Sequence, residues 1–209
     1  MDLLDWLKTR LLSPLPGWRA QLPFQPELSY SRHFAPPPPT ARQAAVMVLL
    51  YPYDGHWVVP LTLRTAGMIE HASQISLPGG SLEPGERSEA AARRELGEEL
   101  GVLPDDLSMI GELSPLYLYN SNFAVQPWLA TATVRPEWIP NAGEVAELIE
   151  VPLQVLCNFN TKKTSQIERY GVACHARGFQ IDGHHVWGGT AMILAEVVAL
   201  VDEYRLQQF

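Results

Sequence analysis

The stretch PGGSLEPGERSEAAARRELGEELGV, Pro78 to Val102, concentrates negative charge directly behind two glycines. It carries glutamates at positions 83, 86, 89, 95, 98 and 99. Glutamates spaced four residues apart on a helix repel each other and weaken it by roughly a few tenths of a kcal/mol per pair. Two explanations are open. The helix presents a solvated face, or a divalent cation among the carboxylates turns the repulsion into coordination.

Helix geometry brings three of these carboxylates together. At about 100° per residue, Glu98 and Glu99 flank Glu95 on one face, within a single turn. Leu96 and Leu100 point away from this face, toward a core. Hard oxygen ligands that converge at short range suit Mg²⁺ or Mn²⁺. The spacing alone is equally that of a solvated helix face, so both explanations stay open at this point.

The neighbours of this face predict room for a ligand. Ala91 and Ala92 are expected on the carboxylate face one turn earlier, where their small side chains leave space. Pro78, Gly79 and Gly80 predict a tight turn whose backbone carbonyls face the same space, because glycine permits a close backbone approach.

The composition indicates one globular domain that does not bind nucleic acid. With 209 residues and 46% hydrophobic content, the chain is long enough to bury one sizeable core. A net charge of -8 and a pI near 5.2 argue against a nucleic-acid partner, which would require a basic stripe to neutralise phosphates. Only two cysteines are present, Cys157 and Cys174, which favours a reduced, cytoplasmic setting without disulfides.

Residues 1–40 are expected to form an extension that packs on the domain or links to it. Apolar residues at positions 3, 4, 7 and 11 follow helical spacing and predict a short amphipathic helix that starts near Asp2. Charged residues interrupt this stretch, so we expect neither a signal peptide nor a membrane span, and no membrane partner. From Ser13 to Thr40 the chain is rich in proline and is expected to run as an extended wrap or linker.

Residues 41–209 are expected to form one domain of mixed strands and helices. The pattern predicts a hairpin of 44–52 with 55–64, two strands around a turn at 120–122, a strand and helix within 144–156, and a last hairpin and closing helix within 173–209. No internal repeat is present. This order predicts the α+β class, arranged as an α/β/α sandwich.

The segment from Gly80 to Val102 follows the pattern G-x5-E-x7-R-E-L-x-E-E-x-G-V, which resembles the Nudix box with every fixed position filled. The resemblance implies an α/β/α sandwich and a divalent-metal-dependent hydrolase of a nucleoside diphosphate linked to another group. It also implies that Arg94 orients the glutamate helix through salt bridges. The metal ligands it implies are Glu95, Glu98, Glu99, Glu86 and the carbonyl of Gly79, with Mg²⁺ or Mn²⁺ as the cofactor.

Hydrolysis of a diphosphate also needs a general base. In the family this is a glutamate of the box or of a later loop, so Glu95, Glu144 and Glu147 are the candidates here. For Glu144 and Glu147, ordinary surface charge at the start of a strand is the competing interpretation.

The segment LTLRTAGMIEHASQISLPGG, residues 61–80, resembles the signature that precedes the box in coenzyme A diphosphatases, a Nudix subfamily. The matching residues are Leu61, Thr62, Arg64, His71, Gln74, Pro78, Gly79 and Gly80. The signature departs at Ile69, Ser73 and Leu77, where the subfamily has arginine, glycine and phenylalanine. An arginine can bind a phosphate with two hydrogen bonds, and isoleucine cannot.

The resemblance implies hydrolysis of coenzyme A or acyl-CoA to 3′,5′-ADP and a 4′-phosphopantetheine product. Substrate contacts are expected from Arg64, His71 and Gln74, and from Lys162 and Lys163 in a basic loop after position 158. The alternatives are a hydrolase of ADP-ribose, nucleotide sugars, NADH or (d)NTPs, and a catalytically silent nucleotide-binding module on the same fold. The expected partner is a small-molecule nucleotide substrate, and a homodimer stays open.

Overall fold

The computed structural model describes residues 2–67, 74–169 and 171–208. Within these residues, the larger sheet contains β1 (Arg42–Tyr53), β2 (His56–Arg64), β3 (Ile75–Ser76), β4 (Gly79–Ser81), β5 (Ser108–Glu112), β6 (Leu116–Leu118), β7 (Phe123–Thr131) and β8 (Val145–Pro152). The smaller sheet contains β9 (Lys162–Arg169), β10 (Val172–Ile181) and β11 (His184–Val186). The α-helices are α1 (Leu3–Arg10), α2 (Trp18–Gln21), α3 (Ser88–Leu100), α4 (Leu153–Cys157) and α5 (Gly188–Leu206). Short 3-10 helices span Leu22–Phe24, Arg32–Phe34, Pro104–Asp106 and Phe159–Thr161.

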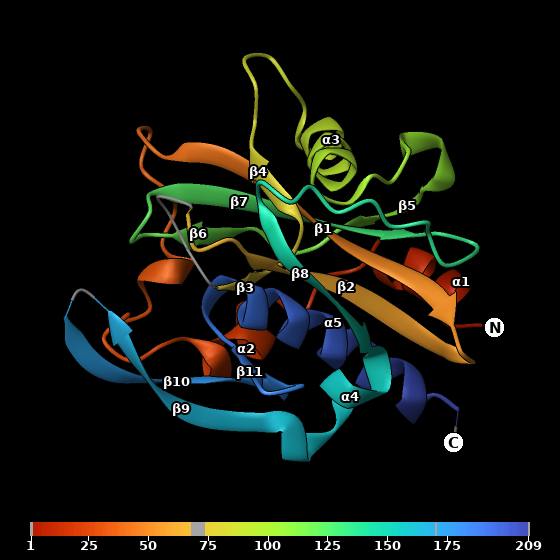
Figure 1. Cartoon of the computed structure of the whole chain (residues 1–209). Coiled ribbons are helices and arrows are strands. Elements are labelled where there is room, and N and C mark those ends of the chain that lie inside the picture. Colours follow the sequence, from red (N-terminus) through yellow and green to blue (C-terminus); the bar gives the residue numbers. More distant parts are fainter. Residues whose placement is uncertain (1, 68–73, 170, 209) are drawn as a thin grey trace.

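Helices cover both faces of the larger sheet, with α3 on one side and α5 on the other (Figure 1). Alternate side chains of β1 therefore pack against different helices. Met47 and Leu49 pack in the apolar cluster beneath α3, whereas Val48 and Leu50 pack in the cluster around α5. Successive strand residues point to opposite faces, so a strand that is covered twice must be apolar nearly throughout. The result is the α/β/α sandwich of the α+β class that the sequence predicts.

The central strand β1 pairs in parallel with β7 and antiparallel with β2 and β4. Its register sets Arg42 opposite Phe123, and sets Ala44 between Val125 on β7 and Ser81 on β4. The predicted hairpin of β1 with β2, the strands β6 and β7 around residues 119–122, and the closing helix α5 are all confirmed. The first residues of β1 pair with β7 on one side and β4 on the other, so they fix the positions of both strands, whereas β2 pairs with the last residues of β1.

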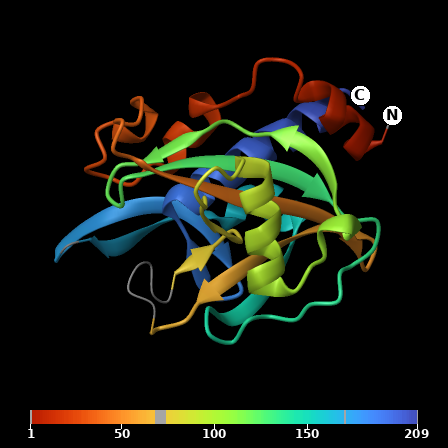
Figure 2. The same ribbon diagram turned by 90° about the horizontal axis from the view of Figure 1, so that it is seen from above.

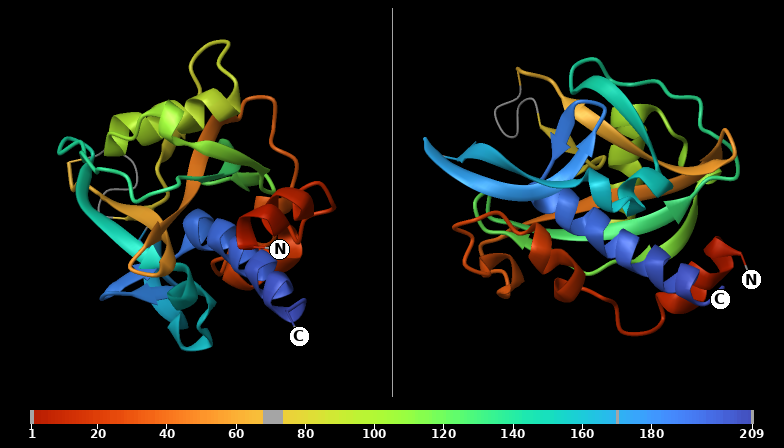
Figure 3. Two further views of the ribbon diagram at one scale, coloured as in Figure 1. Left: turned by 90° about the vertical axis from the view of Figure 1, so that its right-hand side faces the viewer. Right: turned by 90° about the horizontal axis from the view of Figure 1, so that it is seen from below.

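Helix α5 lies between the larger sheet and the smaller one, beside α1 (Figure 3). Most of its residues from Ala191 to Val201 are buried, as expected for a helix covered on most of its circumference. The helix expected near Asp2 is confirmed: the Asp2 carboxylate accepts the N–H of Asp5 at 2.9 Å as an N-cap. Trp6 on α1 donates its indole N–H to Gln207 at 2.8 Å, which joins the two ends of the chain (Figure 2).

The proline-rich segment is less extended than the sequence predicts. Between Ser13 and Thr40 it contains α2 and two 3-10 helices. Pro23 lies in the first turn of Leu22–Phe24, where a missing N–H costs nothing. Phe24 stacks on Phe179 of β10 with ring centroids 4.8 Å apart, so side-chain packing against the smaller sheet holds this turn. The run from residue 35 to 39 has no regular structure.

Three local expectations are wrong. Gly79 and Gly80 do not form a turn, because Gly79–Ser81 is strand β4 on β1. Ala91 and Ala92 leave no room for a ligand, because both are fully buried in the cluster beneath α3. Lys162 does not begin a basic loop, because Lys162–Arg169 is strand β9, paired with β10. Among the described residues, no helix is long and apolar enough to cross a bilayer.

Candidate active site

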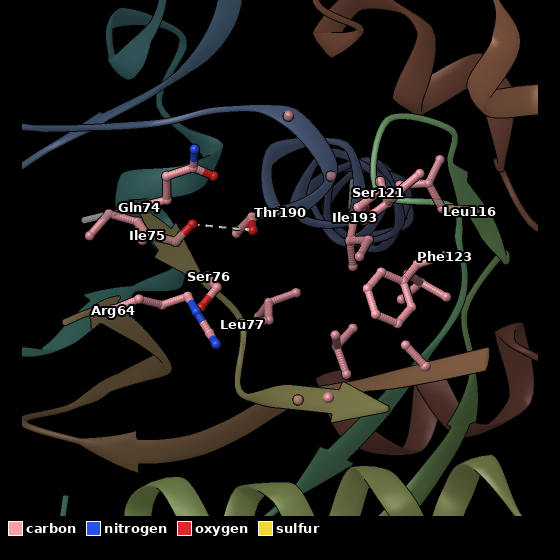
Figure 4. A pocket seen from close by; sticks show the side chains of 18 of the residues that line it. Arg64, Gln74, Ile75, Ser76, Leu77, Leu116, Ser121, Phe123, Thr190 and Ile193 are labelled. Carbon is pink, nitrogen blue, oxygen red and sulfur yellow. Dashed lines mark hydrogen bonds between the residues drawn. The ribbon is translucent and has the colours of Figure 1, made fainter. Parts of the chain in front are cut away.

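A cavity of about 910 Å³ opens between α3, the first residues of β1, and the beginning of α5. Its lining comes from segments far apart in the sequence, including β3, β4, β6 and β7. Figure 4 shows that Leu116, Phe123 and Ile193 lie together on one side of it, while Arg64 and Gln74 lie on the other. The cavity therefore has an apolar side and a polar side.

Arg94 holds the exposed part of the glutamate face together. Its guanidinium donates to Glu86 at 2.9 and 3.0 Å, to Glu95 at 2.9 Å and to Glu98 at 2.9 Å. It also donates to the carbonyl of Ser81 at 3.0 Å, which ties α3 to the end of β4. Hydrogen bonds from Arg94, helped by the N–H of Glu83, hold the pKa of Glu86 below its ordinary value.

Glu99 is buried at the polar side of the cavity, and its side chain is only 2% exposed. The N–H of Gly79 approaches its Oε1 at 3.5 Å, and Arg64 Nη1 lies 3.7 Å from the same oxygen. Burial raises the pKa of Glu99 to about 7, against the opposing effects of Arg64 and the Gly79 N–H. Its Oε2 and the Nε of Arg64 are both buried without a hydrogen-bond partner among the described residues.

Glu95 lies against the backbone of β4. A Cβ added to Gly80 would come within 2.5 Å of the Glu95 carboxylate, so a larger residue there would push this carboxylate out of its present position. Burial is the main reason that the pKa of Glu95 is raised, and the hydrogen bond from Arg94 opposes it. The charges of Glu98 and Glu144 raise this pKa further. The charges of Glu95 and Glu144 likewise raise the pKa of Glu99, so negative charge gathers at this side of the cavity.

The residues present fit a divalent cation. In the described ranges no three His, Cys, Asp or Glu side chains already converge to hold a metal, because Glu95 and Glu98 are paired with Arg94. Glu99 nevertheless has a buried carboxylate oxygen without a partner among the described residues, and a cation there would oppose the burial that raises its pKa. Carboxylate oxygens are the donors that Mg²⁺ and Mn²⁺ prefer.

The two later candidates for the general base lie in different places. Glu144 lines the cavity, and Asn141 donates to its carboxylate at 3.4 Å. Glu147 lies on β8 with a half-exposed side chain, 3.5 Å from His184. It is not among the described residues that line the cavity. Only Glu144 and Glu95 of the three candidates therefore face the space where a substrate would bind.

Of the predicted substrate contacts, some line the cavity and others do not. Arg64, the last residue of β2, and Gln74, directly before β3, both line the cavity, and the carbonyl of Gln74 accepts the N–H of Arg64 at 3.0 Å. His71 lies outside the described residues. Lys162 and Lys163 are absent from the described lining, although Glu168 at the other end of β9 belongs to it.

The opposite wall contains residues that the sequence does not single out. Arg42, Phe123 and Leu118 follow one another across β1, β7 and β6 at the outer end of the cavity. The guanidinium of Arg42 lies over the ring of Phe123, 3.9 Å from its centroid. The alternation of side chains along β1 assigns Arg42 and Ala44 to one face, but only the pairing with β7 and β6 reveals that this face lines the cavity.

Residues 41–171 match the NUDIX domain family. The uncharacterized Nudix hydrolase NudL of Pectobacterium atrosepticum is 31% identical over 163 residues, which cover 78% of this chain and 84% of the relative. NudL of Yersinia pestis is 28% identical over 187 residues, covering 88% and 91%. Among solved structures, a MutT/nudix family protein from Enterococcus faecalis has a TM-score of 0.51 at 16% identity over 83% of this chain and 67% of that one. The MutT protein of Methanosarcina mazei has a TM-score of 0.50 at 15% identity, over 78% and 95%.

Proposed function

Because this chain belongs to the Nudix family of hydrolases, we propose that it cleaves the diphosphate of coenzyme A or of an acyl-CoA. The products are 3′,5′-ADP and 4′-phosphopantetheine, or its acyl derivative. The observation that carries this proposal is the position of the described residues of 61–80, the segment that resembles the coenzyme A diphosphatase signature. Within it, Arg64, residues 74–77, Gly79 and Gly80 line the same cavity as the glutamates of α3. The described residues of the segment that resembles the subfamily's signature thus border the proposed site of cleavage.

The proposed metal ligands are Glu95, Glu98 and Glu99, with Glu86 and the Gly79 carbonyl as further candidates. A bound Mg²⁺ or Mn²⁺ would neutralise the diphosphate and lower the pKa of a bound water. Glu95 and Glu98 each bond Arg94 through one carboxylate oxygen, so the other oxygen of each would be available to the cation. Arg94 would keep its contacts with Glu86 and the Ser81 carbonyl, and would still hold the helix on β4.

The other residues act on the substrate and on protons. Arg64, beside Glu99, would bind a phosphate oxygen of the diphosphate with its guanidinium. Glu144 would accept the proton of the attacking water, because it lines the cavity and lies close enough to influence the pKa of both Glu95 and Glu99. Gln74, which lines the cavity beside Arg64, would contact the substrate as well. The cytoplasm is the proposed compartment, consistent with Cys157 and Cys174 being unpaired.

The test is a panel of substrates with purified protein, assayed with Mg²⁺ and separately with Mn²⁺. The panel contains CoA, acetyl-CoA, a long-chain acyl-CoA, ADP-ribose, NADH and a dNTP, with products identified by mass. We expect kcat/KM to be highest for CoA or an acyl-CoA, with 3′,5′-ADP as one product. A preference of more than tenfold for ADP-ribose, NADH or a dNTP would replace the coenzyme A assignment by that substrate class.

Matched variants on α3 test the metal ligands. Glu99→Gln should lower kcat at least a hundredfold at saturating Mg²⁺, because a neutral amide cannot replace a carboxylate next to the metal. Glu89→Gln is the control, since Glu89 pairs with Arg93 and is not among the described lining residues. Rates for Glu99→Gln within threefold of those for Glu89→Gln would remove Glu99 from the proposed metal site.

A further inference from the structure

The polar side of the cavity accounts for a diphosphate, but coenzyme A carries a second anionic group, the 3′-phosphate of its ribose. The two arginines in the described lining of the cavity are Arg42 and Arg64. Arg64 lies 3.7 Å from the buried Glu99, at the carboxylate end. Arg42 lies at the other end, on the first residue of β1, and its side chain is exposed to solvent.

We infer that Arg42, held on the ring of Phe123, binds the 3′-phosphate and sets the preference for coenzyme A over its dephospho form. This inference rests on the proposed function, because it assigns one end of the proposed substrate to one end of the cavity. It concerns a residue outside the signature segment 61–80, where the expected second arginine is replaced by Ile69.

The surroundings of Arg42 hold its guanidinium in a defined place. The group stacks on Phe123 at 3.9 Å from the ring centroid, and Nη2 donates to the carbonyl of Ser121 at 3.1 Å. A guanidinium stacked on an aromatic ring keeps its N–H groups in one plane, which suits a phosphate because two oxygens can be bound side by side. The ordering cost of the arginine is already met before substrate binds.

Arg42 and the glutamates of α3 line the same cavity from opposite faces of β1. Ala45 pairs with Gly80, which abuts Glu95, and Arg42 lies three residues away, about 10 Å along the strand at about 3.3 Å per residue. Ala44 lies between them on the same face as Arg42, and contributes only a methyl group to the floor of the cavity. Ala45 packs beneath α3, so Ala44 and Arg42 point to the opposite face of β1. The cavity nevertheless reaches both Arg42 and the glutamates of α3, so the diphosphate can lie at Arg64 and Glu99 with the 3′-phosphate toward Arg42.

The lysines considered from the sequence do not occupy such a position. Lys162 and Lys163 begin β9 in the smaller sheet and are not part of the described lining. Both are on the strand whose other end contributes an acidic residue, Glu168, to the cavity. The geometry therefore favours Arg42 over the β9 lysines as the contact for the second phosphate.

The experiment compares CoA with 3′-dephospho-CoA as substrates, and 3′,5′-ADP with AMP as inhibitors or ligands. For Arg42→Gln we expect kcat/KM for CoA and affinity for 3′,5′-ADP to fall at least tenfold. Values for dephospho-CoA and AMP should change less than threefold, which also shows that the variant is folded. Arg42→Lys retains a cation and should lose less of the CoA preference than Arg42→Gln.

Two further variants make the test specific. Phe123→Leu should raise KM for CoA more than for dephospho-CoA, with little change in kcat, because it loosens the arginine without removing it. Arg19→Gln is the matched control and should change no ratio. Arg19 is also exposed and lies over an aromatic ring, 5.8 Å from the centroid of Trp18, but is not in the described lining of this cavity.

The outcomes separate this inference from the proposed function. The role of Arg42 would be overturned by any of three results. Arg42→Gln could lower kcat/KM equally for CoA and dephospho-CoA, or Arg42→Lys and Arg42→Gln could show the same CoA preference. Alternatively, Lys163→Gln could show the loss specific to the 3′-phosphate instead. If the wild-type protein binds 3′,5′-ADP through Arg42 but does not cleave CoA, the proposed function fails and the phosphate site stands.

Discussion

Replacement of Glu196 by glutamine is expected to lower the free energy of unfolding by about 3 to 6 kcal/mol. The side chain is fully buried on α5 and accepts four hydrogen bonds. They come from the N–H of Gly17 at 3.0 Å, the amide of Gln21 at 3.3 Å, and the hydroxyl and N–H of Ser114 at 2.6 and 3.1 Å. Glutamine keeps the shape, but its amide nitrogen turns a donor toward two donors. Each hydrogen bond to a charged group contributes about 1.5 to 3 kcal/mol, and two are lost.

Urea denaturation followed by circular dichroism measures this change, provided that the slope with urea stays constant. Glu203→Gln is the matched control on the same helix. Glu203 binds Arg10 at 2.6 Å, but its side chain is 40% exposed, and surface ion pairs contribute about 0 to 1 kcal/mol. A loss for Glu196→Gln no larger than that for Glu203→Gln would refute the argument that burial and four donors make this carboxylate a strong anchor.

The anchor has a structural consequence beyond its energy. Glu196 joins the N-terminal segment, through Gly17 and Gln21, to the residues between β5 and β6, through Ser114. Both segments border the cavity further along the chain, at His33 and Leu116. Loss of the anchor is therefore expected to raise the KM of the enzyme as well as lower its stability.

Three other predictions concern single carboxylates and one glycine. Gly80→Ala should abolish activity while the fold persists, because the added Cβ would lie within 2.5 Å of the Glu95 carboxylate. A steady-state assay measures the activity, and a melting curve tests whether the fold persists. Glu144→Gln should lower kcat at least tenfold and Glu147→Gln less than threefold, because only Glu144 lines the cavity. Burial alone would raise the pKa of Glu150, but hydrogen bonds from an arginine, a tyrosine and a tryptophan hold it below its ordinary value. This carboxylate therefore stabilises the fold above about pH 4.5 and loses that effect as pH falls through its folded pKa, so Glu150→Gln should flatten the pH dependence of urea midpoints below about pH 5.

The parts of the fold that the sequence predicts are those specified by local pattern. The apolar run of β1 and the helical spacing of α5 need no knowledge of partners, and the turn at Asp54 and Gly55 marks the hairpin with β2. The glutamate face of α3 follows from its period in the same way. Local pattern does not predict which side chains tertiary packing buries. By helical angle, Ala91 and Ala92 lie on the same face of α3 as the glutamates, yet they pack into the sheet because α3 lies flat on β1.

The site is less predictable than the fold, because its walls come from several segments. Arg64 and Gln74 are recognisable from one continuous segment, and both line the cavity. Arg42 and Phe123 are more than eighty residues apart and meet only through the parallel register of β1 with β7. Strand β9 was expected as a loop, because its alternating polar residues have no apolar face to mark a strand; its pairing with β10 supplies the stability instead.

The concentration of like charge on α3 is tolerated because different glutamates are stabilised in different ways. Glu86, Glu95 and Glu98 share the single guanidinium of Arg94, so one positive charge faces three negative ones. Glu99 instead lies in the interior beside Arg64, and burial brings its pKa to about 7. In both arrangements the negative charge of the glutamates exceeds the positive charge of the arginine beside them. Both arrangements also hold carboxylate oxygens close together although these oxygens repel each other. If the proposed metal site is correct, a divalent cation would offset this excess of negative charge, and the stability that the repulsion costs would be recovered on metal binding.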